Sequence, residues 1–344
     1  MIILTTLVLL IAILVNPINL IAQNNNIRIN KRQKSELKKI KKQLDQLNND
    51  KPVSLELKTS QENLTTEGND INIEYKLKSK KISYKHKIKG NIDIKVVKNE
   101  KFDSVDVIDN KIIYSGENSN FDSIIESVSG GVRQIINIKS IDAPSFYDFD
   151  MDLTNDEKLV MNQDGSAVIQ LSNGDIKMLI LAPWAKDADN KDLKTWYEIV
   201  NNSTLRQHID FTNAKFPIKA DPTWCGDVIY QVYWAFSTVY KEKKKRSLHV
   251  VPTWCGRVSG NLTPLNGILG AAKIASHAWQ ELLTKTPLAP EWNKQPNTSL
   301  FWSMHDQFIC HYINPAASIK DIWRMDPWRP NKGLVQTYID LCNS

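Results

Sequence analysis

The chain has 344 residues, of which 42% are hydrophobic and 24% are charged. This length is sufficient for two packed domains, and the hydrophobic content excludes a wholly disordered or fibrous protein. The net charge of +6 conceals three parts: residues 1–42 carry +7, residues 43–222 carry −6 and residues 223–344 carry +5. Such a division concerns association with partners rather than the fold.

An apolar run of 14 residues extends from Ile2 to Val15 and is interrupted only by two threonines. This length suits the core of a signal peptide better than a membrane span of about 20 residues. We therefore expect residues 1–22 to be a cleaved signal peptide or a retained N-terminal anchor, and the protein to be secreted or held at the cell surface. Basic residues follow the run instead of preceding it. This is the reverse of the charge bias that favours export of the chain that follows an apolar run. An inverted anchor and a misassigned start codon therefore remain as alternatives.

Residues 23–52 are predicted to form a basic helical stem or linker. Within residues 31–50 an apolar stripe recurs at helical spacing, and its members are Leu37, Ile40, Leu44 and Leu47. The stripe is too short for a stable coiled coil. The segment is therefore either a solvated stem or a helix that lies on a membrane surface.

Residues 53–221 are predicted to form a β-rich domain, either an antiparallel meander or a sandwich. Apolar and polar residues alternate from Ile71 to Leu77, from Ile82 to Ile88 and from Ile92 to Val96. This alternation is typical of strands with one solvated face. Asn173-Gly174 is a dipeptide that favours a tight hairpin.

The β-rich domain consists of one part or of two, and in the second case the division is expected near Gly130-Gly131. Two histidines, His86 and His208, each stand alone in a strand pattern. We assign both of them structural roles.

Residues 222–344 are predicted to form a small α+β domain rich in tryptophan and stapled by disulfides. All four cysteines lie there: Cys225, Cys255, Cys310 and Cys342. An even number without CxxC spacing indicates two disulfides in an oxidising compartment, the alternative being four buried thiols in a cytoplasmic protein. Of the three possible pairings we favour Cys225 with Cys255 and Cys310 with Cys342, because the first two flank a predicted hairpin.

The pentapeptide PTWCG occurs at residues 222–226 and again at residues 252–256. Between the two copies we expect strands at residues 227–240 and 247–251, joined by a lysine-rich tip. A helix is expected over residues 264–286, with His277 on its solvated side.

Three further motifs resemble an uncharacterised C-terminal domain of secreted proteins from Gram-positive bacteria. They are ADPTWC at residues 220–225, DQFICH at residues 306–311 and PWRP at residues 327–330. The resemblance implies secretion and disulfides. Because the family is a domain of unknown function, the resemblance implies no reaction.

The densest group of chemically active side chains is His305, Asp306 and His311. Together they can in principle provide a general base, its orienting acid and a second proton carrier. In a helix the two histidines lie on nearly opposite sides, and in a strand they stand about 20 Å apart. These residues are therefore catalytic candidates without a firm assignment, and we expect neither a metal nor a cofactor.

Two other segments are candidates for binding, and their residues are Lys241, Lys243, Lys244, Lys245, Arg246, Trp328 and Arg329. Aromatic rings stack on sugars, and arginine forks hold phosphate or carboxylate groups. The ordinary alternatives are a solubilising hairpin tip and a core tryptophan beside an Arg329–Asp326 pair. The binding interpretation predicts a cell-wall polymer, a membrane surface or a protein as partner, and nucleic acid is disfavoured for a secreted chain with an acidic middle.

The leading hypothesis is an exported or surface-associated bacterial protein that binds an anionic or carbohydrate surface or a protein, and that is not an enzyme. The alternative is a secreted hydrolase or toxin that acts through His305, Asp306 and His311. In a third interpretation the β-rich domain is the functional part and the C-terminal domain stabilises it.

Overall fold

The computed structural model describes residues 58–60, 63–68, 70–98, 102–117, 119–240, 243–260, 268–318, 320–334, 337, 340 and 342. The expected signal peptide or anchor, the expected basic stem and Lys241 lie outside these residues. The side chains of Lys243 and Lys244 are also outside the description.

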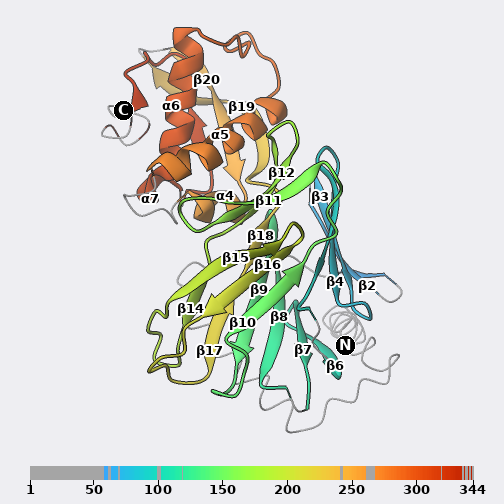
Figure 1. Cartoon of the computed structure of the whole chain (residues 1–344). Coiled ribbons are helices and arrows are strands. Elements are labelled where there is room, and N and C mark those ends of the chain that lie inside the picture. Colours follow the sequence, from blue (N-terminus) through green and yellow to red (C-terminus); the bar gives the residue numbers. More distant parts are fainter. Residues whose placement is uncertain are drawn as a thin grey trace, which may run out of the picture.

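Antiparallel sheets form the middle of the chain, which confirms the β-rich prediction (Figure 1). The first sheet has the strand order β1 (Lys58–Ser60), β2 (Asn63–Glu67), β3 (Ile71–Lys76), β4 (Lys81–His86) and β5 (Gly90–Lys95). A short sheet has the order β10 (Phe146–Asp150), β16 (Thr204–Ile209) and β15 (Thr195–Asn201). The alternating pattern from Ile71 to Val96 thus gives strands joined by tight turns.

The large sheet lies between these elements and the C-terminal domain. Its main path runs β11 (Glu157–Met161), β12 (Ala167–Leu171), β13 (Ile176–Ile180), β18 (Thr223–Cys225), β9 (Gly131–Ile138), β8 (Phe121–Val128), β7 (Lys111–Ser115) and β6 (Ser104–Ile108). Off this path, β17 (Ile218–Asp221) pairs with β9 and with β14 (Trp184–Lys186).

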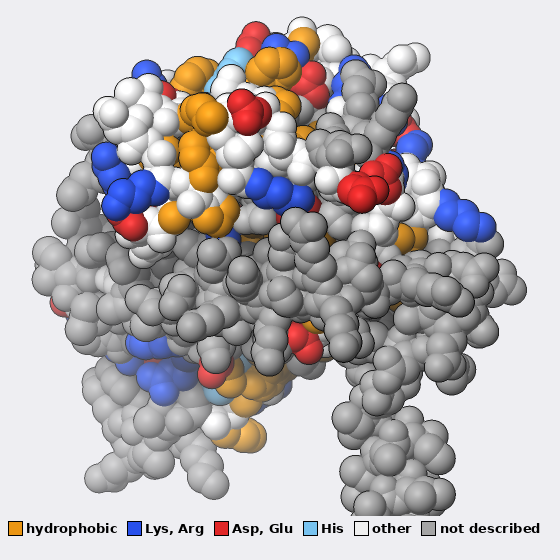
Figure 2. Space-filling model, turned by 90° about the horizontal axis from the view of Figure 1, so that it is seen from below, with side chains coloured by type: hydrophobic (Ala, Val, Ile, Leu, Met, Phe, Trp, Pro, Cys, Tyr) orange, Lys and Arg blue, Asp and Glu red, His pale blue; other side chains and the backbone are white. Residues whose placement is uncertain are grey.

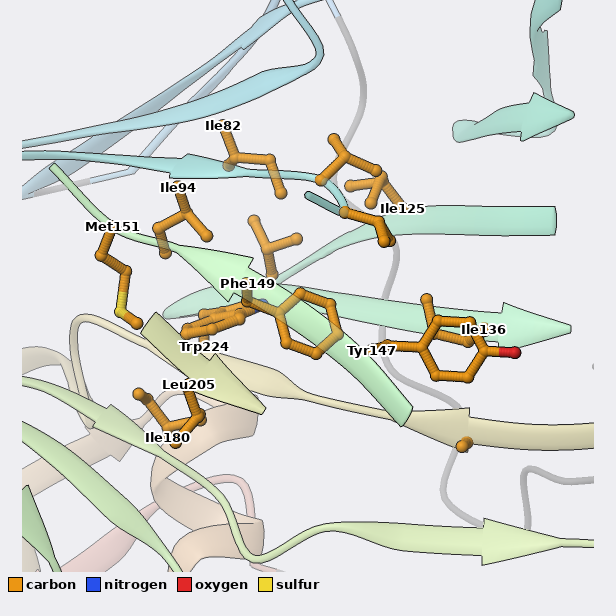
Figure 3. Close-up of a cluster of buried hydrophobic side chains, with 14 of the residues drawn as sticks. Ile82, Ile94, Ile125, Ile136, Tyr147, Phe149, Met151, Ile180, Leu205 and Trp224 are labelled. Atoms are coloured by element: carbon orange, nitrogen blue, oxygen red, sulfur yellow. The ribbon is translucent and has the colours of Figure 1, made fainter. Parts of the chain in front are cut away.

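One hydrophobic core fills the space between the three sheets (Figure 3). Ile82 and Ile94 of the first sheet, Phe149 of the short sheet, and Ile136 and Trp224 of the large sheet meet in it. The core covers one face of the large sheet, which we call its front face. Strands of the large sheet also bury apolar residues on the opposite, back face.

Gly130 and Gly131 lie at the turn between β8 and β9, within the large sheet. A Cβ on Gly131 would stand 2.0 Å from the backbone oxygen of Trp224, so only glycine allows this approach. The expected division at this point is therefore wrong, because the two glycines connect neighbouring strands of one sheet.

The C-terminal domain combines a three-stranded sheet with helices, which confirms the predicted α+β class. The sheet has the order β19 (Ile229–Tyr240), β20 (Lys243–Pro252) and β21 (Trp323–Met325), and the helices are α4 (Trp254–Ser259), α5 (Ile268–Lys285), α6 (Ser299–Ile313) and α7 (Pro315–Ser318). A second core joins this domain to β12 and β13 on the back face of the large sheet.

The favoured disulfide pairing is confirmed. Cys225 of β18 is bonded to Cys255 of α4, and Cys310 of α6 is bonded to Cys342. The first bond therefore links the large sheet to the C-terminal domain. The domain boundary predicted before residue 222 assigns β18 to the C-terminal domain, whereas β18 pairs with β9 and β13 of the large sheet.

Seen from below, basic and acidic side chains lie interspersed with hydrophobic ones over the described part of the surface (Figure 2). Within the described ranges, no helix is long and apolar enough to cross a membrane.

Candidate functional site

The two segments predicted to bind partners meet at the edge of the C-terminal sheet. Strand β21 pairs with β20 so that Arg324 lies opposite His249. Trp323 and Met325 on either side of Arg324 are fully buried, and side chains alternate along a strand. The same alternation therefore directs Arg324 away from the core.

Asp326 follows β21 directly and is 0% exposed. Its carboxylate accepts hydrogen bonds from the Ser247 hydroxyl at 2.6 Å and from Arg329 Nε at 2.8 Å, and Arg324 Nε lies 3.5 Å away. Gln307 of α6 accepts from the Asp326 backbone N–H at 2.7 Å. The buried carboxylate thus holds Arg329 by a hydrogen bond from its Nε atom and forms a longer ion pair with Arg324.

Lys245 reaches the same place from β20. Its ammonium group lies over the ring of Trp328, 5.6 Å from the ring centroid, a distance typical of a cation–π contact. Trp328 is half-buried rather than packed in the core, whereas the expected pairing of Arg329 with Asp326 is present. We call Lys245, Arg324, Asp326, Trp328 and Arg329 the Asp326 cluster.

Arg246 does not join this cluster. Its guanidinium carbon lies 5.8 Å from the Trp234 ring centroid, and Arg246 pairs with Glu291 at 3.4 Å. Neighbouring residues of a strand point to opposite faces, so the lysine-rich segment divides its cations between two surfaces.

His249 lies beside the Asp326 cluster on β20. Burial and the charge of Arg324 lower its pKa, against the opposing effect of Asp326. The imidazole is therefore neutral at neutral pH and adds no positive charge.

The three catalytic candidates lie on α6, where His305 contacts Asp306 but His311 lies apart from both. His305 Nδ1 lies 3.0 Å from Asp306 Oδ1, and the ring of His305 contacts the edges of Trp279 and Trp302. His311 is 0% exposed, donates from Nε2 to the Arg324 carbonyl at 3.1 Å and stacks on Trp323. His311 therefore supports the backbone of β21 instead of facing His305.

A second group of charged residues, the junction cluster, connects the first sheet to the C-terminal domain. Its members are Asp70, His86, Lys89, Asp227, His277, Glu281 and Lys285. No pattern in the sequence indicates this cluster, because its members are far apart in the chain and only folding brings them together.

His86 contributes to the junction cluster through both ring nitrogens. Nδ1 accepts from the backbone N–H groups of Ile88 and Lys89, at 3.0 Å each, so Nε2 carries the proton and donates to Asp227 at 2.8 Å. Its predicted structural role is thus to connect β4 with the segment that precedes β19.

Glu281 lies at the centre of the junction cluster, and its side chain is 3% exposed. Its carboxylate accepts from the backbone N–H of Ile229 at 2.9 Å and lies 3.1 Å from Lys285 Nζ and 3.4 Å from Lys89 Nζ. Burial raises the pKa of Glu281, but Lys89, Lys285, His277 and the hydrogen bond from the Ile229 N–H together lower it to about 2.

His277 of α5 was expected to be solvated, and this expectation is wrong. The residue is half-buried, and burial together with Lys89 lowers its pKa to about 4, against the effect of Glu281, Asp175 and Asp227. The helical pattern alone could not show this, because Lys89, Asp175 and Asp227, whose charges act on His277, are far from it in the chain.

His208, also assigned a structural role, lies on the outer face of the short sheet, in the middle of the three strands. It pairs with Phe146 on one side and with Trp196 on the other, stacks on the Trp196 ring at 5.0 Å and contacts Glu198 at 2.6 Å. Trp196 and Phe146 are 43% and 42% exposed.

Among the described residues, no group of three or more His, Cys, Asp or Glu side chains is arranged to hold a metal ion. The described cysteines are all in disulfides.

Comparison with protein families gives a match in the C-terminal part of the chain. Residues 232–344 match the family described as "Protein of unknown function (DUF2599)". The match begins within β19 and includes the Asp326 cluster, and it confirms that this part of the chain is an uncharacterised domain. No curated protein matches the chain.

Proposed function

We propose that the protein is exported and that its C-terminal domain binds a polyanionic polymer of the cell surface through the Asp326 cluster. The observation that carries this proposal is that Arg324 and Arg329 contact one buried carboxylate while Lys245 lies over the ring of Trp328, the residue before Arg329.

The geometry of the arginines supports an anionic ligand. An arginine held through Nε presents its two terminal amino groups as a fork, which matches the oxygens of phosphate or carboxylate. Asp326 holds Arg329 in this way and forms a longer ion pair with Arg324. The orientation of Arg329 is therefore set before a ligand arrives, which reduces the entropy lost on binding.

The contact between Trp328 and Lys245 favours the interpretation that the ligand is an anion and not a neutral sugar. Its face holds the ammonium group of Lys245, so the ring serves to position a cation. A polymer with repeated anionic groups fits such a surface, because several weak contacts add through multivalency. The excess of +5 over residues 223–344 attracts the same class of ligand at longer range.

Two observations support export. The disulfides Cys225–Cys255 and Cys310–Cys342 are buried, and disulfides persist in oxidising compartments. The apolar run from Ile2 to Val15 has the length of a signal-peptide core.

The test measures binding of the full chain to poly(glycerol phosphate) at low and moderate salt. Lys245→Gln and Arg329→Gln are each expected to weaken binding about fivefold, because a surface ion pair contributes up to about 1 kcal/mol. Lys158→Gln removes the same charge from an exposed position on β11 and is expected to change nothing. Binding of the unmodified chain should weaken as salt rises.

Arg329→Gln also removes a partner of buried Asp326, so thermal unfolding of each variant accompanies the binding assay. Lys245→Gln leaves Asp326 in place and keeps the test decisive if Arg329→Gln is unstable. Equal affinity of Lys245→Gln and the unmodified chain would refute the proposal. Binding to phosphatidylglycerol vesicles without binding to the polymer would also overturn it in favour of a membrane surface.

A further inference from the structure

The short sheet has one face in the core and one face toward solvent. On the inner face, Tyr147, Phe149 and Leu205 are buried in the core between the sheets. On the outer face, Phe146 and Trp196 are 42% and 43% exposed. Large aromatic side chains usually lie inside a protein. Their exposure on one sheet face therefore marks this face as a candidate for binding.

The exposed rings belong to a continuous row across the sheet. The strand register places His208 of β16 directly between Phe146 of β10 and Trp196 of β15. The His208 ring centroid lies 6.1 Å from that of Phe146 and 5.0 Å from that of Trp196. We call these three residues the aromatic row. It crosses two strand spacings, which is about 10 Å.

A polar row runs parallel to the aromatic row, two positions further along each strand. Its members are Asp148, Arg206 and Glu198. Arg206 donates to Asp148 from Nε at 2.7 Å and from Nη2 at 2.9 Å. Glu198 accepts from Nε2 of His208 at 2.6 Å. The polar row thus presents donors and acceptors beside the rings, and their positions are fixed by contacts within the sheet.

Two cations also hold the rings. The guanidinium carbon of Arg206 lies 4.1 Å from the Phe146 ring centroid, and Lys194 Nζ lies 5.3 Å from that of Trp196. These are cation–π distances. Because both rings remain more than two-fifths exposed, the contacts orient the rings and leave surface for a ligand. A surface that is oriented in advance loses less entropy on binding.

The charges of this face favour a ligand without net charge. In the Asp326 cluster the carboxylate is buried, but here the Glu198 side chain is 51% exposed and that of Asp148 is 18% exposed. These carboxylates repel a polyanion. Arg206 and Lys194 repel a polycation in the same way. A neutral ligand that both donates and accepts hydrogen bonds is complementary to such a surface.

We propose that the outer face of the short sheet binds a neutral polysaccharide, at a site separate from the Asp326 cluster. The face of an aromatic ring is electronegative, and the C–H groups on one side of a sugar ring supply the positive partial charge that it attracts. Sugar hydroxyl groups both donate and accept, so they can bond to Glu198 and to Arg206. Chains of several sugars fit better than single sugars, because the aromatic row is longer than one sugar ring.

The test is isothermal titration calorimetry of the full chain with cellohexaose and with chitohexaose. We expect the chain to bind at least one of them, more tightly than it binds glucose or N-acetylglucosamine. Trp196→Ala should weaken binding about tenfold or more, as expected for a central tryptophan of a binding surface. Trp302→Ala is the matched control, because Trp302 is 42% exposed on α6, and it should change nothing.

Thermal unfolding of each variant accompanies the titrations. Phe146→Ala should weaken binding several-fold and keeps the test decisive if Trp196→Ala is unstable. Affinity for the oligosaccharide should be the same at low and high salt, because the ligand carries no charge. Binding that weakens strongly with salt would contradict the proposal.

Three other results would overturn the proposal. They are no binding of either hexasaccharide, equal affinity of the Trp196→Ala and Trp302→Ala variants, and a Trp196→Ala variant that loses self-association but binds sugar normally. The last result would assign the face to a second copy of the chain. Binding to poly(glycerol phosphate) should survive Trp196→Ala and weaken in Lys245→Gln, so the two proposals can fail separately.

Discussion

Individual buried charges join the two parts of the molecule. Glu281 receives backbone N–H groups from the start of β19 and faces Lys89 of the first sheet. Lys285 contacts Glu281 and Asp70. Removing one partner from such a group leaves an uncompensated buried charge, which costs far more than the intact pair contributes.

His277 predicts a specific pH dependence. Its pKa is about 4 in the folded protein and about 6.5 when unfolded, so only the unfolded state binds a proton between these values. The free energy of unfolding should therefore fall as the pH decreases from 6.5 to 4, by about 2–3 kcal/mol from this residue. Urea denaturation of the unmodified chain and of His277→Gln at pH 7 and pH 5 measures the effect.

The comparison with His277→Gln is necessary because Asp221 acts in the opposite direction. Burial raises the pKa of Asp221 to about 6, so its contribution to stability is lost as the pH rises through this range. Asp221 is the same in both proteins, and its effect cancels in the difference. Equal loss of stability on acidification in both proteins would contradict the role assigned to His277.

At the scale of elements, one pentapeptide adopts two structures. The first PTWCG copy supplies β18, which pairs with β9 and β13. The second copy begins α4, where the Thr253 hydroxyl accepts from the Gly256 N–H as an N-cap. Local sequence is the same, so the neighbouring strands decide that the first copy is extended.

The two disulfides close loops of similar length and should contribute similarly to stability. Their sequence separations are 30 and 32 residues, for which loop entropy predicts about 3–4 kcal/mol each. Cys225→Ala with Cys255→Ala and Cys310→Ala with Cys342→Ala are compared by urea denaturation. Losses that differ by more than about 1 kcal/mol would show that native contacts outweigh loop entropy.

At the scale of the whole molecule, the β-rich region and the C-terminal domain form one continuous structure. They share a core that contains Leu179 and Leu181 of the β-rich region and Leu248 and Trp279 of the C-terminal domain. The Cys225–Cys255 bond and the junction cluster cross the same boundary. The interpretation of the C-terminal domain as a stabilising part therefore has a physical basis, alongside its proposed binding role.

A chain that ends at Ala220 tests this continuity. It lacks β18, which lies between β9 and β13 in the large sheet, and it exposes the second core. We expect no cooperative thermal transition in circular dichroism, with the full chain as the control. A truncated chain with a transition as sharp as that of the full chain would show that the β-rich region folds alone.

The sequence by itself determined the β-rich middle, the α+β class of the C-terminal domain and the disulfide pairing. These follow from local periodicity and from cysteines that flank one hairpin, and both are properties of short segments. The Arg329–Asp326 pair was also predictable, because the two residues are three positions apart.

Only the tertiary structure decided how distant residues meet. Lys245 and Trp328 are separated by most of the C-terminal domain, and His86 and Asp227 by 141 positions. The burial of His277 likewise depends on which elements pack against α5. Periodicity shows that a face is apolar or polar, but long-range packing determines what covers that face and which charges are brought together there.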